Sequence, residues 1–293
     1  MRIGITGASG MLGKALVSHL SATNSVFATS KHNGSVHKNT VWHHFDLIDG
    51  DSLNQWLQEV KPDIVIHCAA ITNVDLCEKE VDIATGVHIE STRIIANHQS
   101  IHGGRLIYIS TDSVFDGNSA NPYRETDATN PLNVYAKTKL EGEKFVQAMS
   151  NGLVLRTNII GHTEPGRVSF AEWLLEGLIE KKPLNLFYDV YFSPLHVNDL
   201  SAIIGKIIEE PIVGLYHCAS RDSISKYDFG KKMAELFELS DSNINRVSVD
   251  NMGFKADRPK NMALNIDKIS RSLSYQMPNA IDAILTMKQN MSQ

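Results

Sequence analysis

Short, nearly continuous apolar runs alternate along the first half of the chain with longer stretches in which apolar residues recur at helical spacing. Residues 2–6 form one such run, and Leu12, Leu16 and Leu20 follow it at four-residue intervals, which is typical of an amphipathic helix. Residues 63–70 form another run with little polar alternation, as expected for a parallel strand that helices cover on both faces. The pattern predicts the α/β class.

The alternation continues far enough to predict a doubly wound parallel sheet of the Rossmann type. We expect residues 1–157 to form a dinucleotide-binding domain and residues 158–293 a smaller α/β substrate domain, from which residues 195–215 can pack back on the first. In the smaller domain we place a strand at 214–218 and a helix that Ser225 caps. The other predicted elements are strands at 26–30, 41–46 and 106–110 and helices near 53–60, 82–102, 135–145 and 170–178.

Three glycines, Gly7, Gly10 and Gly13, stand between the first strand and the first helix. A dinucleotide needs a turn without side chains here, so that backbone amides at the helix N-terminus can face the pyrophosphate. The first gap is one residue longer than in the usual Gly-x-Gly-x-x-Gly pattern. We interpret the turn as a dinucleotide site; the alternative is a tight turn without a ligand.

The end of the second strand is polar and basic, with Ser30 and Lys31 followed by His32. A carboxylate at this position would hold the ribose hydroxyls of NAD, and none is present, so the sequence favours NADP(H) while NAD(H) stays possible. A solvated turn is the other interpretation of Lys31 and His32. Asp46 and Leu47 follow the third strand and could approach the adenine, although Asp46 could equally be a helix cap.

Thr111 ends the fifth strand, and Tyr135 and Lys139 lie one turn apart on the helix that follows. Parallel sheets bind ligands at the carboxyl ends of their strands, so these three side chains can converge, whereas Ser110 should point to the other face. A nearby ammonium is expected to lower the pKa of the phenol and suit it to acid-base catalysis. An ordinary surface helix would also produce Tyr-x-x-x-Lys.

Composition narrows the class of protein further. The 293 residues carry a net charge of −5 with both signs interspersed, which argues against a nucleic-acid surface. Cys68, Cys77 and Cys218 lack metal-ligand spacing, so we expect no metal and a reducing compartment. We expect no signal peptide, no membrane span and a cytoplasmic location.

Taken together, these motifs resemble the extended short-chain dehydrogenase/reductases, and among them the dTDP-4-dehydrorhamnose reductase-like group. The resemblance is dense up to about residue 160 and thin beyond it. It is carried by residues 6–13, 69–70, 74–75, 110–112, 114–117, 122–123, 125, 130–133, 135, 139 and 155–157, and by Arg258 with Pro259.

The resemblance implies reduction of a nucleotide-linked 4-keto-6-deoxysugar, as in polysaccharide biosynthesis. Tyr135 would protonate the developing alkoxide, Lys139 would bind the nicotinamide ribose, and Thr111 would hold the carbonyl oxygen. The implied cofactor-binding residues are Gly7, Ser9, Gly10, Met11, Leu12, Ser30, Lys31, Asp46, Leu47, Ala69, Ala70, Tyr135 and Lys139. The implied substrate-binding residues are Thr72, Asp112, Ser113, Asn158 and Arg258, the last with Lys255 and Lys260 as candidates for a diphosphate or as a solvated basic loop.

At three positions this sequence carries residues that differ from those usual in the dTDP-4-dehydrorhamnose reductase-like group. Ser113 stands where a tyrosine is usual, and Asn158 opens a segment that usually contains a tryptophan, so aromatic walls expected around the sugar are absent there. His88 falls where relatives carry an asparagine that helps position the catalytic lysine. The specific sugar is therefore open.

Two other functions stay compatible with the sequence. One is a non-catalytic, NADP-binding regulatory subunit similar to the methionine adenosyltransferase β subunit, and the other is a nucleotide-sugar epimerase or dehydratase. For the reductase, the expected partners are a nucleotide-sugar substrate and a second copy of the chain in a homodimer.

Overall fold

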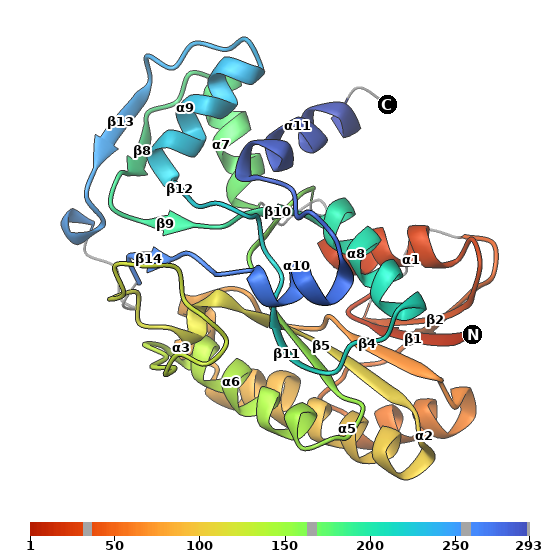
Figure 1. Cartoon of the computed structure of the whole chain (residues 1–293). Coiled ribbons are helices and arrows are strands. Elements are labelled where there is room, and N and C mark those ends of the chain that lie inside the picture. The colour runs from red at the N-terminus through yellow and green to blue at the C-terminus, as the bar shows by residue number, and fades with distance from the viewer. Residues whose placement is uncertain (32–36, 163–168, 253–258, 292–293) are drawn as a thin grey trace.

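A seven-stranded parallel sheet forms the centre of the computed structural model, which describes residues 1–31, 37–162, 169–252 and 259–291 (Figure 1). Its order is β11-β6-β5-β4-β1-β2-β3, and every pairing in it is parallel. The predicted Rossmann-type α/β class is confirmed. The strands are β1 (Arg2–Thr6), β2 (Ser25–Ser30), β3 (Thr40–His44), β4 (Ile64–His67), β5 (Arg105–Thr111), β6 (Leu153–Thr157) and β11 (Gly214–His217).

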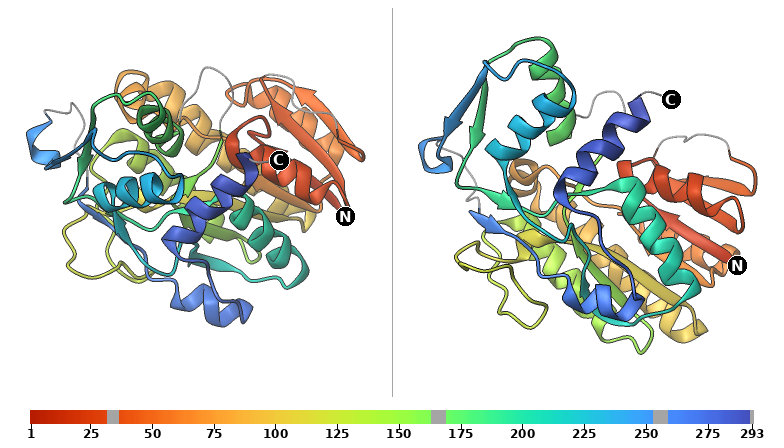
Figure 2. Two further views of the ribbon diagram at one scale, coloured as in Figure 1. Left: turned by 90° about the horizontal axis from the view of Figure 1, so that it is seen from above. Right: turned by 45° about the horizontal axis from the view of Figure 1, so that its top comes forward.

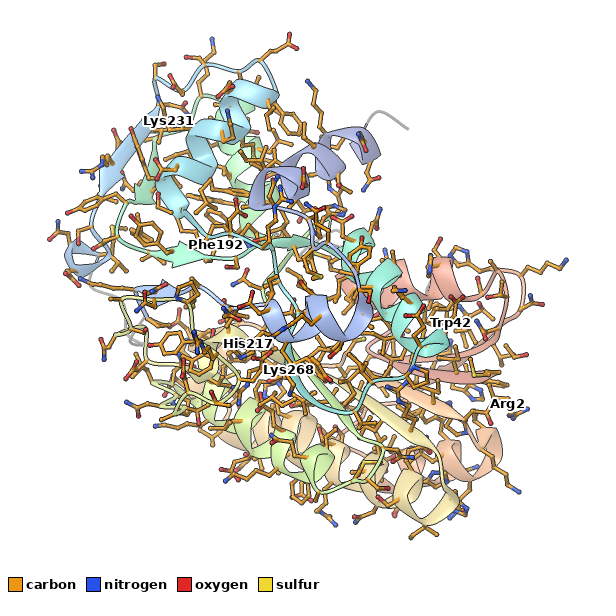
Figure 3. The ribbon with its side chains drawn as sticks, in the orientation of Figure 1. Arg2, Trp42, Phe192, His217, Lys231 and Lys268 are labelled. Atoms are coloured by element: carbon orange, nitrogen blue, oxygen red, sulfur yellow. The ribbon has the colours of Figure 1, made fainter. Side chains whose placement is uncertain are left out.

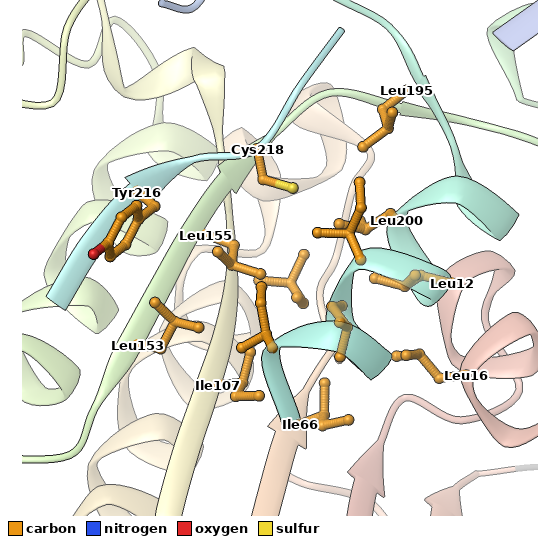
Figure 4. Packing of buried hydrophobic residues seen from close by; sticks show 14 of the residues in the cluster. Leu12, Leu16, Ile66, Ile107, Leu153, Leu155, Leu195, Leu200, Tyr216 and Cys218 are labelled. Atoms are coloured by element: carbon orange, nitrogen blue, oxygen red, sulfur yellow. The ribbon is translucent and has the colours of Figure 1, made fainter. Parts of the chain in front are cut away.

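Helices cover both faces of this sheet (Figure 1). On one face lie α1 (Met11–Leu20) and α8 (Val197–Glu209), with α10 (Asp267–Leu273) beside β11. Leu12 and Leu200 of these helices pack on Ile66 and Ile107 of the sheet (Figure 4). The other face is covered by α2 (Gly50–Val60), α5 (Ser91–His102) and α6 (Val134–Gln147). This double cover explains why the central strands are almost uniformly apolar.

One predicted helix is divided into several parts. Residues 82–102 contain α4 (Val81–Thr85), the π-helix η1 (Gly86–Glu90) and α5, and α3 (Val74–Lys79) precedes them. A π-helical turn is often found at functional sites. Here it carries His88 into the interior, beneath α6.

The strand at residues 214–217 belongs to the central sheet, so its prediction as part of the smaller domain is wrong. β11 pairs with β6, and the buried Arg105 donates from its guanidinium to the backbone carbonyl of Ile207, 3.1 Å away, at the end of α8. The free edge of β6 offers unpaired backbone groups, which β11 satisfies. The chain therefore returns to the first unit after entering the second.

The smaller unit lies beside the sheet and has its own apolar core (Figure 2). Phe170, Phe192 and Phe229 meet in it with ring centroids 5.3–5.9 Å apart, and Phe192 lies on the side toward the sheet (Figure 3). The elements outside the sheet and its helices are η2 (Asp112–Val114), β7 (Ile159–Ile160), α7 (Phe170–Ile179), β8 (Leu184–Phe187), β9 (Tyr191–Phe192), β10 (Leu195–His196), β12 (Ile224–Ser225), α9 (Lys226–Leu236), β13 (Ile244–Val247), η3 (Val249–Asn251), β14 (Asn261–Met262) and α11 (Ala280–Met291).

The helices α6 and α9, which carry residues of the site, are each capped at the N-terminus by a side chain. Asn133 accepts from the amide of Ala136 at the start of α6, and Ser225 accepts from Asp228 at the start of α9, which confirms the predicted cap. The cap of α2 is Asp49, not Asp46.

Candidate active site

The glycine turn leaves its backbone open at the N-terminus of α1. Gly7 has a φ of +65°, and a Cβ there would lie 2.7 Å from the Cα of Ala69, so only glycine fits. A Cβ on Gly13 would lie 2.3 Å from the Gly7 carbonyl oxygen. The turn thus brings the helix N-terminus close to the end of β4, as binding of a pyrophosphate requires. The predicted cofactor residues in this turn are Gly7, Ser9, Gly10, Met11 and Leu12, of which Leu12 is buried against the sheet.

The ends of β2 and β3 bring two predicted cofactor residues together. The Lys31 ammonium lies 2.7 Å from the Asp46 carboxylate, and both side chains are exposed. Asp46 also accepts from the amide of Ile48. Ser30 is buried at the end of β2, Leu47 is half-buried beside Asp46, and His32 lies outside the described residues.

A buried polar chain supports the end of β4. His67 contacts the Thr6 hydroxyl through Nδ1 at 2.5 Å and the Ser91 hydroxyl through Nε2 at 3.1 Å. Burial and the charge of Lys139 lower the pKa of His67 to about 3, so the ring is neutral. The Thr6 hydroxyl also accepts from the amide of Ala69, at 3.4 Å. The segment after β4 is thereby fixed beside the glycine turn, with Ala70 half-buried and Thr72 exposed.

Tyr135 of α6 and Thr111 at the end of β5 face each other. Burial raises the pKa of the Tyr135 phenol to about 12, hydrogen bonding with Thr111 acts in the opposite direction, and Asp112 raises the pKa further. The Thr111 hydroxyl donates to Asp112 at 3.1 Å and accepts from the amide of Ser113 at 3.1 Å. The phenol therefore points to the carboxyl end of β5 rather than to bulk solvent. Ser110 points to the other face, as predicted, and donates to Glu143.

Lys139 is buried below Tyr135 and turned toward the sheet. Its ammonium donates to the Ile109 carbonyl at 2.6 Å and lies 4.0 Å from the centre of the Tyr108 ring. Burial lowers its pKa to about 7, although Glu143 acts in the opposite direction. The expectation that the pKa of Tyr135 is lowered is wrong, because burial raises it to about 12 while the Lys139 ammonium is turned to the Ile109 carbonyl.

His88 connects the segment after β4 to the helix of Tyr135. Its Nε2 accepts from the amide of Ile71 at 2.9 Å, so Nδ1 carries the proton and donates to the Thr138 hydroxyl at 2.7 Å. The ring packs edge-on against Tyr135, with centroids 5.7 Å apart. Burial and nearby Lys139 lower the pKa of His88 to about 2. His88 is therefore a neutral side chain with a fixed tautomer that helps hold Tyr135 in place.

Asp112 lies at the junction of the sheet and the smaller unit. Asn158 donates to its carboxylate at 2.6 Å and Ser113 at 3.2 Å. Burial raises the pKa of Asp112, against these hydrogen bonds and the charge of Lys226. Three of the predicted substrate residues, Asp112, Ser113 and Asn158, are thus brought together.

Glu143 and Arg156 form a buried ion pair behind the site, and neither residue was among the predicted site residues. The Arg156 guanidinium donates to both carboxylate oxygens, with a shortest distance of 2.7 Å, and the side chains are 3% and 0% exposed. Glu143 also accepts from Ser110 at 2.5 Å. Glu143 follows Lys139 by four residues, and this helical spacing was the available signal.

Of the three residues predicted to contact a diphosphate, the structure describes only Lys260. Arg258 and Lys255 lie outside the described residues. Lys260 lies 2.5 Å from Asp250 and 3.6 Å from Asp189, so its charge is already compensated within the protein. No group of three or more histidine, cysteine or carboxylate side chains in the described ranges is arranged to hold a metal ion.

The predicted resemblance to the extended short-chain dehydrogenase/reductases is confirmed by comparison with known proteins. The chain belongs to the RmlD substrate binding domain family, which matches residues 1–292. The match spans the central sheet and the smaller unit alike.

Three similar proteins differ in what their names describe. The chain is 30% identical to the methionine adenosyltransferase 2 subunit beta of Bos taurus, over 92% of this chain and 81% of that protein. It is 27% identical to a Haloferax volcanii protein named "Probable low-salt glycan biosynthesis reductase Agl14", over 97% and 96%. The crystal structure of dTDP-4-dehydrorhamnose reductase from Bacillus anthracis in complex with NADP superposes with a TM-score of 0.85 at 29% identity, covering 99% of each chain.

Proposed function

We propose that this protein is an NAD(P)H-dependent reductase of a nucleotide-linked 4-keto-6-deoxysugar. The observation that carries the proposal is the meeting of Thr111 and Tyr135 at the carboxyl end of β5, with Lys139 buried beneath them. The names of the Bacillus anthracis and Haloferax volcanii proteins describe reductases and support the same reaction class.

Each side chain of the site has a separate role in the proposed reduction of the keto group. Bound NADPH would supply the hydride for the keto carbon. Thr111 hydrogen-bonds the keto oxygen, and Tyr135 donates its proton to that oxygen as negative charge develops there. A pKa of about 12 keeps the phenol protonated at neutral pH, which is the form that donates. Lys139 binds the nicotinamide ribose, and His88 holds the Tyr135 ring.

We assign cofactor binding to residues 1–157 and most substrate contacts to residues 158–293, with α8 and β11 serving the first unit. A homodimer in the cytoplasm without nucleic-acid partners is the expected form of the enzyme. No helix among the described residues is both long and apolar enough to cross a membrane.

NADPH is the favoured cofactor, because Lys31 lies at the end of β2 with an exposed side chain and can exchange its partner Asp46 for the 2′-phosphate of NADPH. The Lys31→Glu variant should lose about tenfold or more in kcat/KM for NADPH relative to NADH, as expected for one lost charge-assisted hydrogen bond. Steady-state kinetics with both cofactors measures this. Lys206→Glu is the matched control, since Lys206 also pairs with an exposed carboxylate, Glu210. An unchanged cofactor ratio in Lys31→Glu would reject the assignment.

A regulatory subunit is the second candidate. It is favoured by the 30% identity to the methionine adenosyltransferase 2 subunit beta of Bos taurus. The same glycine turn would then bind NADP without turnover.

Incubation with NADPH and a panel of 4-keto sugar nucleotides, starting with dTDP-4-dehydrorhamnose, separates the two candidates. We expect a loss of absorbance at about 340 nm with at least one sugar, which reports oxidation of the cofactor. Tight NADPH binding without turnover on any sugar, together with altered kinetics of a methionine adenosyltransferase, would favour the subunit instead.

A further inference from the structure

Lys226 brings an ammonium group to the junction of the two units, beside the proposed site. It is the first residue of α9, directly after the cap Ser225, and its backbone amide donates to the Val190 carbonyl at 3.0 Å. Its Nζ lies 3.3 Å from the centre of the Phe192 ring and 4.0 Å from that of Phe170. The base of the side chain is thus fixed, and two aromatic rings line its end.

The Lys226 ammonium makes no hydrogen bond or ion pair within the described part of the chain. The charge that most favours its protonated form is that of Asp112, whose carboxylate already accepts from Thr111, Ser113 and Asn158. An ammonium carries three donors, and cation–π contacts compensate only part of the cost of removing them from water. Burial accordingly lowers the pKa of Lys226 to about 7. Such a group is suited to bind oxygen atoms of a ligand.

We propose that Lys226 donates hydrogen bonds to oxygen atoms of the sugar in a nucleotide-linked hexose substrate and helps determine which sugar is accepted. The proposal rests on the proposed function and extends it, because it assigns a sugar-binding wall to the smaller unit. Phe170 is half-buried and offers an apolar face to the carbon side of the sugar ring, whereas Phe192 is fully buried and contacts the Lys226 ammonium from within the core. Phe170 thus supplies, from the smaller unit, aromatic surface that Ser113 and Asn158 do not.

Equilibrium binding tests the assignment without requiring turnover. We would titrate dTDP-rhamnose, and separately dTDP, into the protein saturated with NADPH, a combination in which neither ligand can be reduced. Lys226→Met is one atom shorter and removes the charge while keeping an unbranched side chain. It should weaken dTDP-rhamnose binding about tenfold or more while changing the Kd of dTDP less than twofold. Lys232→Met is the control, since Lys232 lies on the same helix and pairs with Glu235.

Lys226→Arg keeps a cationic donor and should retain more affinity for dTDP-rhamnose than Lys226→Met, which a merely structural role would not predict. If Lys226→Met is poorly folded by circular dichroism, the Lys226→Gln and Lys226→Arg pair provides the same comparison. Equal affinity of wild type and neutral variant for dTDP-rhamnose, parallel losses for dTDP and dTDP-rhamnose, or no binding of dTDP-rhamnose to the wild type would each overturn the proposal. If the wild type binds dTDP-rhamnose through Lys226 but reduces no keto sugar, the reductase assignment fails while the binding role stands.

Discussion

Replacing Tyr135 by phenylalanine is expected to lower kcat for keto-sugar reduction by about 10²-fold or more, while the Kd for NADPH changes little. The phenol faces Thr111 and is the proposed source of the proton that the substrate oxygen takes up. Phenylalanine keeps the ring that packs against His88 but removes the proton donor. Steady-state reduction kinetics and fluorescence titration of NADPH measure the two quantities.

Tyr275→Phe is a suitable control for this substitution. Tyr275 is 37% exposed and follows α10, and it loses the same hydroxyl group in the variant. Its kinetics should match those of the wild type. If Tyr135→Phe retains full kcat, Tyr135 has no part in proton transfer, and the reductase mechanism proposed above has to be abandoned.

Glu143→Gln should reduce the free energy of unfolding by about 3–5 kcal/mol, because it leaves the buried guanidinium of Arg156 without its counter-charge. The substitution preserves the size of the side chain, so the loss reports charge rather than packing. The side-chain amide of the new glutamine can still accept the hydrogen bond that Ser110 donates, so this hydrogen bond adds little to the loss of stability. Urea denaturation followed by circular dichroism measures the change.

Glu141→Gln provides the comparison on the same helix. Glu141 pairs with Lys144 at 2.6 Å, but both side chains are about half exposed, and such surface pairs contribute roughly 0–1 kcal/mol. If Glu141→Gln and Glu143→Gln lower the free energy of unfolding by similar amounts, the buried pair stabilises the protein no more than an exposed pair does. A large loss in Glu143→Gln alone supports its role in joining α6 to β6 behind Thr111.

The elements nearest the glycine turn could be predicted because their signals are local. The strand at β1, the glycines after it and the helix that follows each require particular residue types within about twenty positions. Tyr135 and Lys139 are likewise one helical turn apart, so one segment fixes both. Thr111 joins them because strands of a parallel sheet end at a common edge.

Other features depend on contacts between distant segments. The strand at residues 214–217 has no local signal for which sheet it joins, and its pairing with β6 depends on the free edge of β6. The phenol of Tyr135 was expected to have a lowered pKa from its neighbour Lys139, but Lys139 turns to the Ile109 carbonyl and burial dominates the phenol instead.

The sequence by itself determined the α/β class and predicted the glycine turn and the set of Thr111, Tyr135 and Lys139. Local residue type and spacing mark the turn and the helical pair, and the common edge of a parallel sheet adds Thr111. Only the tertiary structure decided which side chains surround them. Lys226 lies more than a hundred residues from Asp112, yet folding brings the ammonium and the carboxylate to one junction. Burial then sets their pKa values, because the loss of water around a charged group depends on the packing of the whole chain.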